Sequence, residues 1–183
     1  MEMRHAEPPL TIFTIGHSTH SIEEFIGMLM EHGIQTVADV RSIPGSRHNP
    51  QFNGNELAKS LTNAGIGYVH MAELGGLRHA KKDSINPGWE NASFRGFADY
   101  MQTGAFEEGI MKLIGTAKRQ RTVIMCAEAV PWRCHRSLIA DALFVRGAEV
   151  LHIMSRKSAK PHAVTSWAEV KGTTITYPKP KTT

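Results

Sequence analysis

Short apolar segments rich in β-branched residues alternate along the chain with longer segments of helical period, and this alternation constrains the fold most. Five segments are predicted to be strands: 10–15, 36–40, 66–70, 122–126 and 149–154. Five segments between them are predicted to be helices: 21–32, 55–64, 94–101, 105–118 and 135–146. Strands that alternate with helices require crossover connections, which give a parallel sheet with helices on both faces. The sequence therefore predicts a three-layer α/β fold with a mainly parallel sheet of about five strands.

Local sequence signals mark several boundaries of these elements. Ser21 followed by Glu24 is the pattern of a capping box, in which the serine hydroxyl accepts a hydrogen bond from a first-turn amide. Gly33, Gly65 and Gly147 each follow a helical segment, where glycine adopts the left-handed conformation at little cost. These signals support the predicted order of helices and strands.

The length and composition limit the class of protein. A chain of 183 residues suits one domain and can bury a core without disulfides or a structural metal. Hydrophobic residues make up 41% and charged residues 21%, a balance that argues against wholesale disorder, and two cysteines are too few for a disulfide scaffold. No apolar run approaches the roughly 18 residues that span a bilayer, and residues 1–9 lack the apolar stretch of a secretory signal. We therefore expect a cytoplasmic protein without membrane contact, whose oligomeric state is open.

Positive charge is concentrated at the C-terminal end of the chain. Residues 155–183 carry six Lys or Arg and one Glu, whereas residues 1–154 carry 15 Lys or Arg and 16 Asp or Glu. The chain is accordingly divided into a single α/β domain over 1–155 and a basic extension over 156–183, with an edge strand expected at 173–177. Such an extension can bind phosphate groups by releasing counterions, or it can simply solvate the protein.

Two long segments rich in Gly, Pro and Asn interrupt the regular pattern, residues 41–54 and 71–92. Each follows a predicted strand, so each should emerge at the carboxyl edge of the sheet, where open α/β sheets bind ligands. Loops of this length in a compact domain are often functional covers, and the alternative is a pair of mobile surface loops.

The segment CAEAVPWRCHR at 126–136 carries the strongest chemical signal. Cys126 ends a buried apolar strand, and Cys134 and His135 open the next helix, where free amides and the helix dipole favour anions. Together with Arg136, these groups can lower a thiol pKa and raise its nucleophilicity. Cys126 is therefore the candidate nucleophile, expected to be mostly buried at the floor of a pocket. The alternative is that it is a small residue of the core.

Three more specific interpretations of this segment fit less well. Arg133 lies one position too far from Cys126 for the loop of a cysteine phosphatase. Seven residues separate Cys126 from Cys134, whereas two separate the cysteines of the usual redox dithiol. A zinc site could use both cysteines, His135 and His17, but no paired C-x-x-C is present and adjacent Cys-His is an awkward chelate. A zinc-dependent hydrolase stays as an alternative.

Polar and charged residues also follow the first three strands. His17 and Ser18 lie in a loop after the first strand, where the histidine could act as a general base, bind an anion or stabilise the loop. Asp39 and Arg41 project to one face of the second strand because they are two residues apart, and a buried Asp39 should lie within salt-bridge reach of an arginine. Arg78, in the second long loop, could contact an anion. The first loop has too few glycines for a dinucleotide fingerprint, so no dinucleotide cofactor is assigned.

Six motifs occur in order along the chain: IGHS at 15–18, DVRSIPGSR at 39–47, PQF at 50–52, YVHMAELGGLR at 68–78, FRGFADYM at 94–101 and MCAEAVPWRCHR at 125–136. Together they resemble the family called domain of unknown function 488, over roughly residues 10–155. The resemblance implies an α/β protein and supplies no reaction. The recurring positions of the family correspond here to His17, Ser18, Asp39, Arg41, Ser46, Gly75, Gly76, Arg78, Cys126, Glu128, Cys134, His135 and Arg136.

The sequence predicts an enzyme of hydrolase or transferase type that acts on an anionic substrate, a nucleotide or a nucleic-acid component. The candidate catalytic residues are His17, Asp39, Cys126, Glu128 and His135. The candidate substrate-binding residues are Ser18, Arg41, Arg78, Cys134 and Arg136. Six of these side chains are expected to face one concave pocket: His17, Asp39, Arg41, Cys126, Glu128 and His135. The alternative from another class is a non-catalytic module that binds a nucleotide or nucleic acid. Cofactors are left open, and no residue is assigned as a metal ligand.

Overall fold

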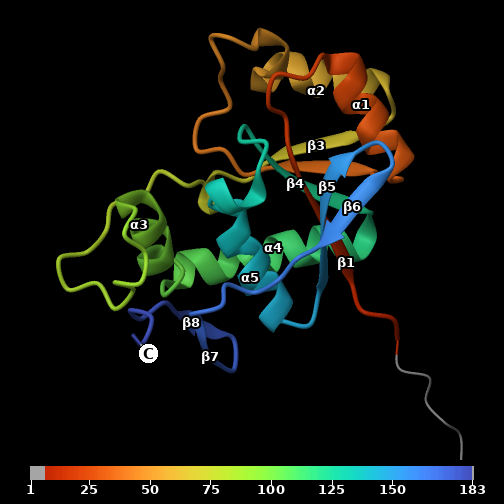
Figure 1. The fold of residues 1–183 in the computed structure, drawn as a ribbon. Coiled ribbons are helices and arrows are strands. Elements are labelled where there is room, and N and C mark those ends of the chain that lie inside the picture. Colours follow the sequence, from red (N-terminus) through yellow and green to blue (C-terminus); the bar gives the residue numbers. More distant parts are fainter. Residues whose placement is uncertain (1–6, 183) are drawn as a thin grey trace, which may run out of the picture.

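The computed structural model describes residues 7–182, which are built around one six-stranded sheet (Figure 1). Its strands are β1 (Thr11–Gly16), β2 (Thr36–Asp39), β3 (Gly67–His70), β4 (Thr122–Cys126), β5 (Glu149–Ser155) and β6 (Ser158–Pro161). Their order across the sheet is β3-β2-β4-β1-β5-β6. The pairs among β1 to β5 are parallel, and β6 runs antiparallel to β5. The predicted α/β class with a mainly parallel sheet is confirmed.

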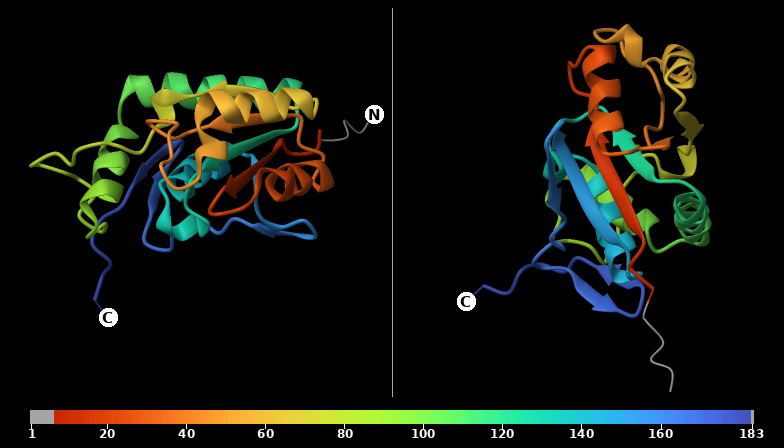
Figure 2. Two further views of the ribbon diagram at one scale, coloured as in Figure 1. Left: turned by 90° about the horizontal axis from the view of Figure 1, so that it is seen from above. Right: turned by 90° about the vertical axis from the view of Figure 1, so that its right-hand side faces the viewer.

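Five α-helices cover the two faces of this sheet, as Figure 2 shows in two further views. They are α1 (Ile22–Glu31), α2 (Gly54–Asn63), α3 (Ala92–Tyr100), α4 (Gly104–Arg119) and α5 (Arg136–Val145). Buried side chains of α1 and α2 pack on one face, and those of α3, α4 and α5 pack on the other. All five predicted helices are present, and the three-layer arrangement is confirmed.

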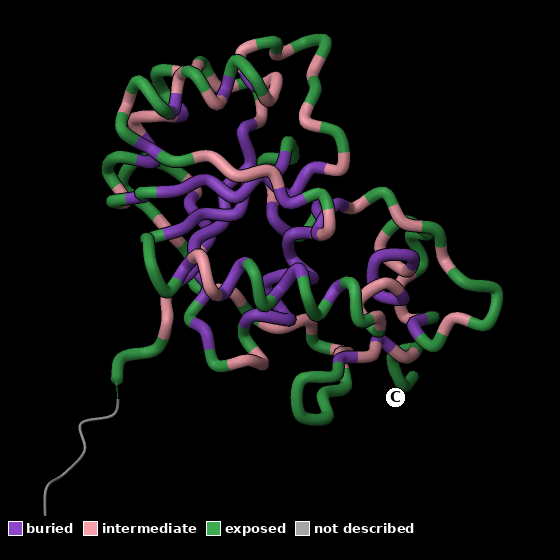
Figure 3. The backbone as a smooth tube through the Cα atoms, turned by 180° about the vertical axis from the view of Figure 1, so that it is seen from behind, coloured by how far each residue is buried: buried purple, intermediate pink, exposed green. Residues whose placement is uncertain are grey.

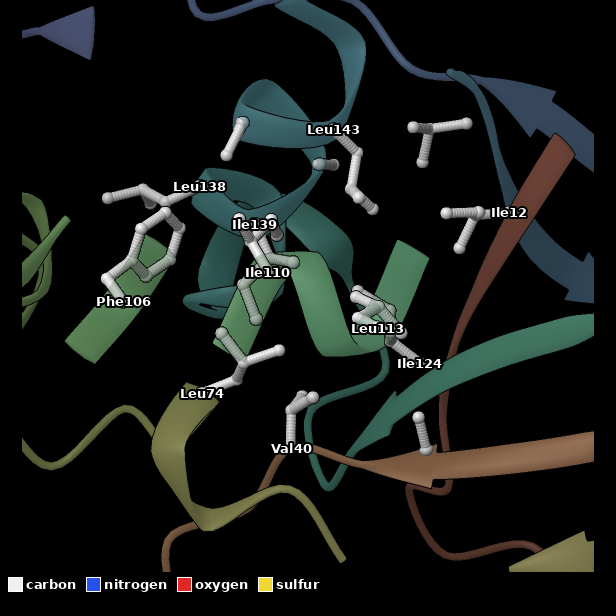
Figure 4. Close-up of a cluster of buried hydrophobic side chains, with 14 of the residues drawn as sticks. Ile12, Val40, Leu74, Phe106, Ile110, Leu113, Ile124, Leu138, Ile139 and Leu143 are labelled. Carbon is white, nitrogen blue, oxygen red and sulfur yellow. The ribbon is translucent and has the colours of Figure 1, made fainter. Parts of the chain in front are cut away.

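Alternate residues of the central strands contribute to two separate cores, because successive side chains of a strand point to opposite faces. In β1, Ile12 packs beneath α4 and α5, and Phe13 packs beneath α1 and α2. In β4, Ile124 belongs to the core beneath α4 and α5, and Val123 belongs to the core beneath α1 and α2. Figure 4 shows Ile12 and Ile124 in the first core with Leu113 of α4, and the buried segments gather in the sheet in Figure 3. This double burial explains why the strands read as continuous apolar runs.

The predicted cap signals are present in the structure. The Ser21 hydroxyl accepts a hydrogen bond from the Glu24 amide, at 3.1 Å, and begins α1. Gly33, Gly65 and Gly147 have φ values of 68°, 76° and 86°, in the left-handed region that glycine enters at little cost. These local interactions fix the ends of α1, α2 and α5.

The predicted edge strand at 173–177 needs correction. The segment forms β8 (Thr174–Thr176), which pairs with β7 (Glu169–Lys171) in a separate two-stranded ribbon. Gly172, with φ 61°, allows the tight turn between these two strands. The edge of the main sheet beside β5 is occupied by β6, because the chain turns at 156–157 and returns along β5.

Part of the basic extension packs into the body of the protein. Ile175 and Tyr177 are 2% and 0% exposed, and both belong to the core beneath α4 and α5. The Tyr177 hydroxyl donates a 2.8 Å hydrogen bond to Asp141 of α5. Removing residues 156–183 would therefore expose core as well as remove charge.

Residues 1–6 of the polar N-terminal segment lie outside the described residues. Within residues 7–182, no helix is long and apolar enough to cross a membrane.

Candidate functional site

The connections of the sheet leave a crevice at the carboxyl end of β4. This strand lies between β2 and β1, and the chain leaves both neighbours toward the face covered by α1 and α2. After β4 the chain turns instead to α5 on the opposite face. Ligands of open α/β sheets bind where neighbouring connections diverge in this way. Cys126, the last residue of β4, lies at this point.

A cavity of about 510 Å³ opens there, and we call it the Cys126 cavity. Both long loops contribute to its walls, which shows that they cover the carboxyl edge as predicted. The loop after β2 contributes Arg41, Ser42, Ile43 and Gly45. The second long loop and the start of α3 contribute Gly76, Leu77, Asn91, Ser93 and Phe94. The end of β4 and the loop after it contribute Cys126, Ala127, Glu128, Arg133, Cys134 and His135.

The two cysteines meet at the floor of this cavity. Their Sγ atoms are 2.7 Å apart, and Cys134 is placed to donate its S–H to Cys126. Cys126 is 3% exposed and Cys134 is 7% exposed, and neither forms a disulfide. The prediction that Cys126 is mostly buried near the first turn of α5 is confirmed. The contact between the sulfur atoms was not predicted, because the spacing argued against a dithiol.

Arg136 is buried beneath Cys126 and is only 1% exposed. Its Nη1 donates to Cys126 Sγ at 2.6 Å and to the Glu128 carbonyl. Its Nη2 donates to the Ala129 carbonyl at 3.0 Å, and its Nε donates to Thr14 Oγ1 at 3.3 Å. Across residues 7–182, no Asp or Glu forms an ion pair with this guanidinium. A buried charge without a partner is costly, so the Cys126 thiolate is the group that can balance it.

The surroundings of the two thiols separate their pKa values. Burial raises the pKa of Cys126, but the hydrogen bond from Cys134 and the positive charge of Arg136 outweigh it and lower that pKa to about 7. The hydrogen bond that Cys134 donates and its burial raise the pKa of Cys134. Near neutral pH the pair therefore holds one proton on Cys134 and a substantial fraction of thiolate at Cys126.

His135 presents an unprotonated nitrogen beside the pair. Its Nε2 lies 3.0 Å from the carbonyl oxygens of Val40 and of Leu74, and carbonyls only accept hydrogen bonds, so Nε2 carries the hydrogen. Burial lowers the pKa of His135 to about 4 and keeps the ring neutral. Nδ1 is then an acceptor, 3.5 Å from Cys134 Sγ. A Cβ at Gly76 would lie 2.6 Å from this Nδ1, so the ring requires a glycine there.

The predicted ion pair of Asp39 is confirmed. The carboxylate, which is 0% exposed, accepts from Arg41 Nε at 2.9 Å and Nη2 at 2.7 Å, and from the Tyr68 hydroxyl at 2.7 Å. Arg41 Nη2 also donates to the Phe52 carbonyl, at 2.8 Å. These contacts fix one side of the guanidinium, while the Arg41 side chain also lines the Cys126 cavity.

His17 also contacts Arg41 and does not line the Cys126 cavity. Its Nδ1 lies 2.9 Å from the Ser18 carbonyl and therefore donates, which leaves Nε2 to accept from Arg41 Nη1 at 3.4 Å. The ring stacks on Phe52 with centroids 4.3 Å apart, and burial lowers the pKa of His17. A neutral His17 therefore holds Arg41 from the side opposite Asp39.

The candidate residues fall into three groups by position. Those that line the cavity are Arg41, Cys126, Glu128, Cys134 and His135. Those that contact a lining residue from behind are His17, Asp39 and Arg136. The other two bring no side chain to the cavity. Ser18 contacts the lining residue Ala127 through its backbone amide alone, and the Arg78 guanidinium bonds to the carbonyls of Ala72, Glu73 and Gly75 and stacks on Tyr100. The prediction that six side chains face one pocket is therefore correct for Arg41, Cys126, Glu128 and His135. It is wrong for His17 and Asp39, which are buried behind Arg41 and contact its guanidinium.

Sequence reasoning missed a buried hydrogen-bonded chain that begins at Arg136. Thr14 Oγ1 accepts from Arg136 and lies 2.6 Å from His152 Nδ1. His152 Nε2 lies 2.9 Å from His162 Nδ1, and His162 Nε2 lies 2.7 Å from Asp141 Oδ1. If the rings of His152 and His162 are both neutral, each group donates a hydrogen bond to the next one, from Arg136 through Thr14, His152 and His162 to Asp141. The only sequence signal was the presence of Asp141 and His152 within apolar segments.

The residues that the structure describes contain no group of three or more His, Cys, Asp or Glu side chains arranged to hold a metal ion. Cys126, Cys134 and His135 do lie together, but the His135 Nε2 hydrogen is directed at backbone carbonyls. The described residues therefore offer no ligand set for the zinc site of that alternative.

Comparison with known proteins gives one match. A family model described as "Domain of unknown function DUF488" matches residues 21–143, which is more than half of the chain. No curated protein and no solved structure matches. The matched range contains most of the Cys126 cavity, including both cysteines, His135 and Arg136. The chain therefore belongs to the DUF488 family.

Proposed function

We propose that this protein is an enzyme that uses the Cys126 thiolate as a nucleophile on an anionic substrate bound in the Cys126 cavity. The observation that carries the proposal is the 2.6 Å contact between the buried Arg136 guanidinium and Cys126 Sγ. A thiolate held beside a guanidinium, at the floor of an open cavity, is the arrangement of a reactive cysteine. A cysteine with a purely structural role is instead expected to be protonated among apolar neighbours.

The groups around Cys126 support roles in binding and proton transfer. Arg41 has donors fixed by Asp39, Phe52 and His17, and its second Nη1 hydrogen has no protein partner among the described residues. The Arg41 guanidinium, through that hydrogen, and the exposed Arg133 side chain are the cationic groups that can bind an anion in the cavity. In this proposal Asp39 and His17 are positioning residues for Arg41 and have no direct catalytic role.

Proton transfer and the positioning of water fall to three lining residues. Cys134 can give its proton to a leaving group, because it already donates toward Cys126. His135 Nδ1 can accept a hydrogen bond from an attacking water and orient it, since its tautomer leaves that nitrogen free, and the proton then passes to solvent. The exposed carboxylate of Glu128 lies at the mouth and can serve the same purpose on the solvent side.

A second, more basic cavity supports a nucleotide or nucleic-acid component as the substrate. This basic groove, about 820 Å³ in volume, is lined by Lys81, Lys82, Arg95 and Lys179 together with Glu90. The two cavities are lined by neighbouring residues of the chain at the start of α3: Asn91, Ser93 and Phe94 line the Cys126 cavity, and Glu90 and Arg95 line the basic groove. A nucleotide in the first could continue into a phosphate chain along the second.

The test of the nucleophile is the pH dependence of alkylation. We expect iodoacetamide to modify Cys126 with an inflection near pH 7, because the Arg136 charge and the Cys134 hydrogen bond lower its pKa. Below that pH the rate should fall as the thiolate is protonated. Peptide mass spectrometry would measure the rate at Cys126 and Cys134 separately, with the Cys126→Ser variant as the blank. An inflection at about 8.5 or above would favour the non-catalytic binding module.

The same assay tests the substrate class. Adenosine, cytidine, guanosine and uridine monophosphates, or short oligonucleotides, should slow alkylation of Cys126, whereas the matching nucleosides without phosphate should not. An equal rate with and without every nucleotide would refute this class of substrate. The protein should be reduced first and the reductant removed before iodoacetamide is added, because a thiol reductant would consume the reagent. Reduced thiols are the state expected of the cytoplasmic protein that we propose.

The basic groove predicts salt-dependent binding of nucleic acid. Exchanging Lys81 and Lys82 for glutamate should weaken binding of a single-stranded oligonucleotide about tenfold and lower the slope of log K against log salt by about one, since phosphate contacts release counterions. Fluorescence anisotropy over a salt series measures both quantities. Lys118→Glu with Arg119→Glu, at the cavity below the amino ends of the strands, is the matched control. Identical losses in both variants would show a general charge effect and no site.

A further inference from the structure

We propose that Cys126 and Cys134 form a redox-active dithiol that reduces small hydroperoxides, with Cys126 as the attacking cysteine and Cys134 as the resolving cysteine. The proposal rests on the nucleophilic Cys126 of the proposed function and adds a second substrate class and a role for Cys134. The juxtaposition that carries it is the 2.7 Å separation of two free sulfur atoms at the floor of one cavity.

The positions of the two sulfur atoms favour an intramolecular disulfide. A disulfide bond is about 2.05 Å long, so the bond can form with little movement of either side chain. Cys126 is fixed at the end of β4, and Cys134 precedes α5 in an extended conformation, with φ −131° and ψ 146°. The seven residues between them fold back through a 3₁₀ turn at Pro131–Arg133, which brings the two ends together.

The two cysteines are also differentiated chemically. Cys126 is in contact with Arg136 Nη1, which stabilises a thiolate, and Cys134 receives the Arg136 backbone amide at 3.5 Å. Cys134 also lies 3.5 Å from His135 Nδ1, which can accept a hydrogen bond from its S–H. One sulfur is thus prepared to attack an electrophile, and the other is held protonated beside it for the second step.

The reaction balances with a hydroperoxide ROOH as the oxidant. The Cys126 thiolate attacks the terminal oxygen, an S–O bond forms as the O–O bond breaks, and RO⁻ leaves and takes a proton from water to become ROH. The Cys134 thiol then attacks Cys126 Sγ. The S–S bond forms as the S–O bond breaks, and the departing hydroxide takes the proton of the Cys134 thiol and leaves as water. The dithiol loses two electrons, and an external dithiol must return them.

The depth of the thiolate favours small oxidants, because Cys126 is only 3% exposed at the floor of the cavity. Hydrogen peroxide is only slightly larger than a water molecule and can reach the sulfur. The disulfide would also occupy the nucleophile, so the same chemistry would suspend and then restore the proposed enzyme activity.

Hydrogen peroxide treatment of the full-length reduced protein tests the dithiol. Wild type should consume one equivalent of peroxide and then stop. Mass spectrometry should detect a disulfide that links the peptide of Cys126 to the peptide of Cys134, and dithiothreitol should restore both thiols. The Cys134→Ser variant keeps a hydroxyl donor at that position and should stop at a Cys126 sulfenic acid that dimedone traps. The Cys126→Ser variant should consume peroxide at least about tenfold more slowly, because its remaining thiol lacks the Arg136 contact.

The outcomes separate this inference from the proposed function. If alkylation of Cys126 has its inflection near pH 7 but peroxide yields only sulfenic or sulfinic acid in wild type, the dithiol is refuted and the nucleophile stands. If alkylation shows no lowered inflection in wild type or in Cys134→Ser, the nucleophile itself is refuted. A disulfide that links two copies of the chain, detected on a non-reducing gel, would also overturn the intramolecular pair.

Discussion

Replacing Arg136 with methionine should slow alkylation of Cys126 at pH 7 by about tenfold or more. The guanidinium is the only cation in contact with the sulfur among residues 7–182, and its removal leaves burial opposed mainly by the Cys134 hydrogen bond, so the thiol pKa should rise from about 7 toward its ordinary value of about 8.5. At pH 7 the thiolate fraction then falls from about one half to a few per cent. The measurement is the pH–rate profile with iodoacetamide, which should move its inflection upward by more than one pH unit.

The same replacement should lower the free energy of unfolding by about 3 kcal/mol or more. The methionine side chain cannot donate to Thr14, which is buried, or to the part-buried carbonyls of Glu128 and Ala129, and an acceptor that stays out of water without a donor is costly. Urea denaturation at pH 7 measures this loss. Because Arg136→Met could fail to fold, Arg136→Lys serves as the second variant: it keeps the charge and should retain most of the reactivity while losing stability.

Arg133→Met is the matched control for both measurements. Arg133 lies three residues away, is exposed at the rim of the cavity, and is not among the donors to either sulfur. Its removal should leave the alkylation profile and the stability nearly unchanged. If a folded Arg136→Met protein reacts at pH 7 as fast as wild type, the guanidinium does not activate Cys126, and the proposed mechanism loses its main support.

The regular elements could be predicted because their signals are local. Helix ends are fixed by contacts within a few residues, such as the Ser21 cap and the left-handed glycines, and strand burial follows from continuous apolar runs. Topology then placed the ends of parallel strands together, which is why Arg41, Cys126 and His135 were expected at one edge. The structure shows these three side chains around a single cavity.

The remaining features depend on contacts between distant residues, which periodicity does not encode. The spacing of Cys126 and Cys134 argued against a dithiol because spacing predicts contact only within regular elements, and the irregular loop between them folds back. The directions of His17 and Asp39 toward Arg41 depend on the packing of the loop after β2. The burial of Tyr177 is fixed by Asp141, which lies 36 residues earlier, and charge counting could not reveal it.

Acid should destabilise the fold between pH 6.5 and pH 4. Burial lowers the pKa of His135 and of His152 to about 4, whereas unfolded histidines titrate near 6.5. Between these values the unfolded chain binds more protons than the folded one, so stability rises with pH through this window and is lost as the pH falls. At pH 5 each histidine costs about 2 kcal/mol relative to pH 7, or about 4 kcal/mol for the two. His17 contributes in the same direction.

Urea denaturation at pH 7, 6 and 5, in His152→Gln and in wild type, tests this directly. The variant should be less stable at pH 7, because Thr14 and His162 lose a ring partner, but its stability should fall less steeply with acid, by about 2 kcal/mol at pH 5. The exposed His48→Gln is the control and should keep the wild-type slope. An unchanged slope in His152→Gln would mean that the pKa of His152 in the folded protein equals that in the unfolded chain, so that the ring is protonated by pH 5. The donors between Arg136 and Asp141 could then not run in one direction, because a protonated ring cannot accept a hydrogen bond at Nδ1 from the Thr14 hydroxyl. The acid sensitivity of His152 and the direction of the hydrogen bond between Thr14 and His152, next to Arg136, therefore both depend on a neutral, buried His152 ring.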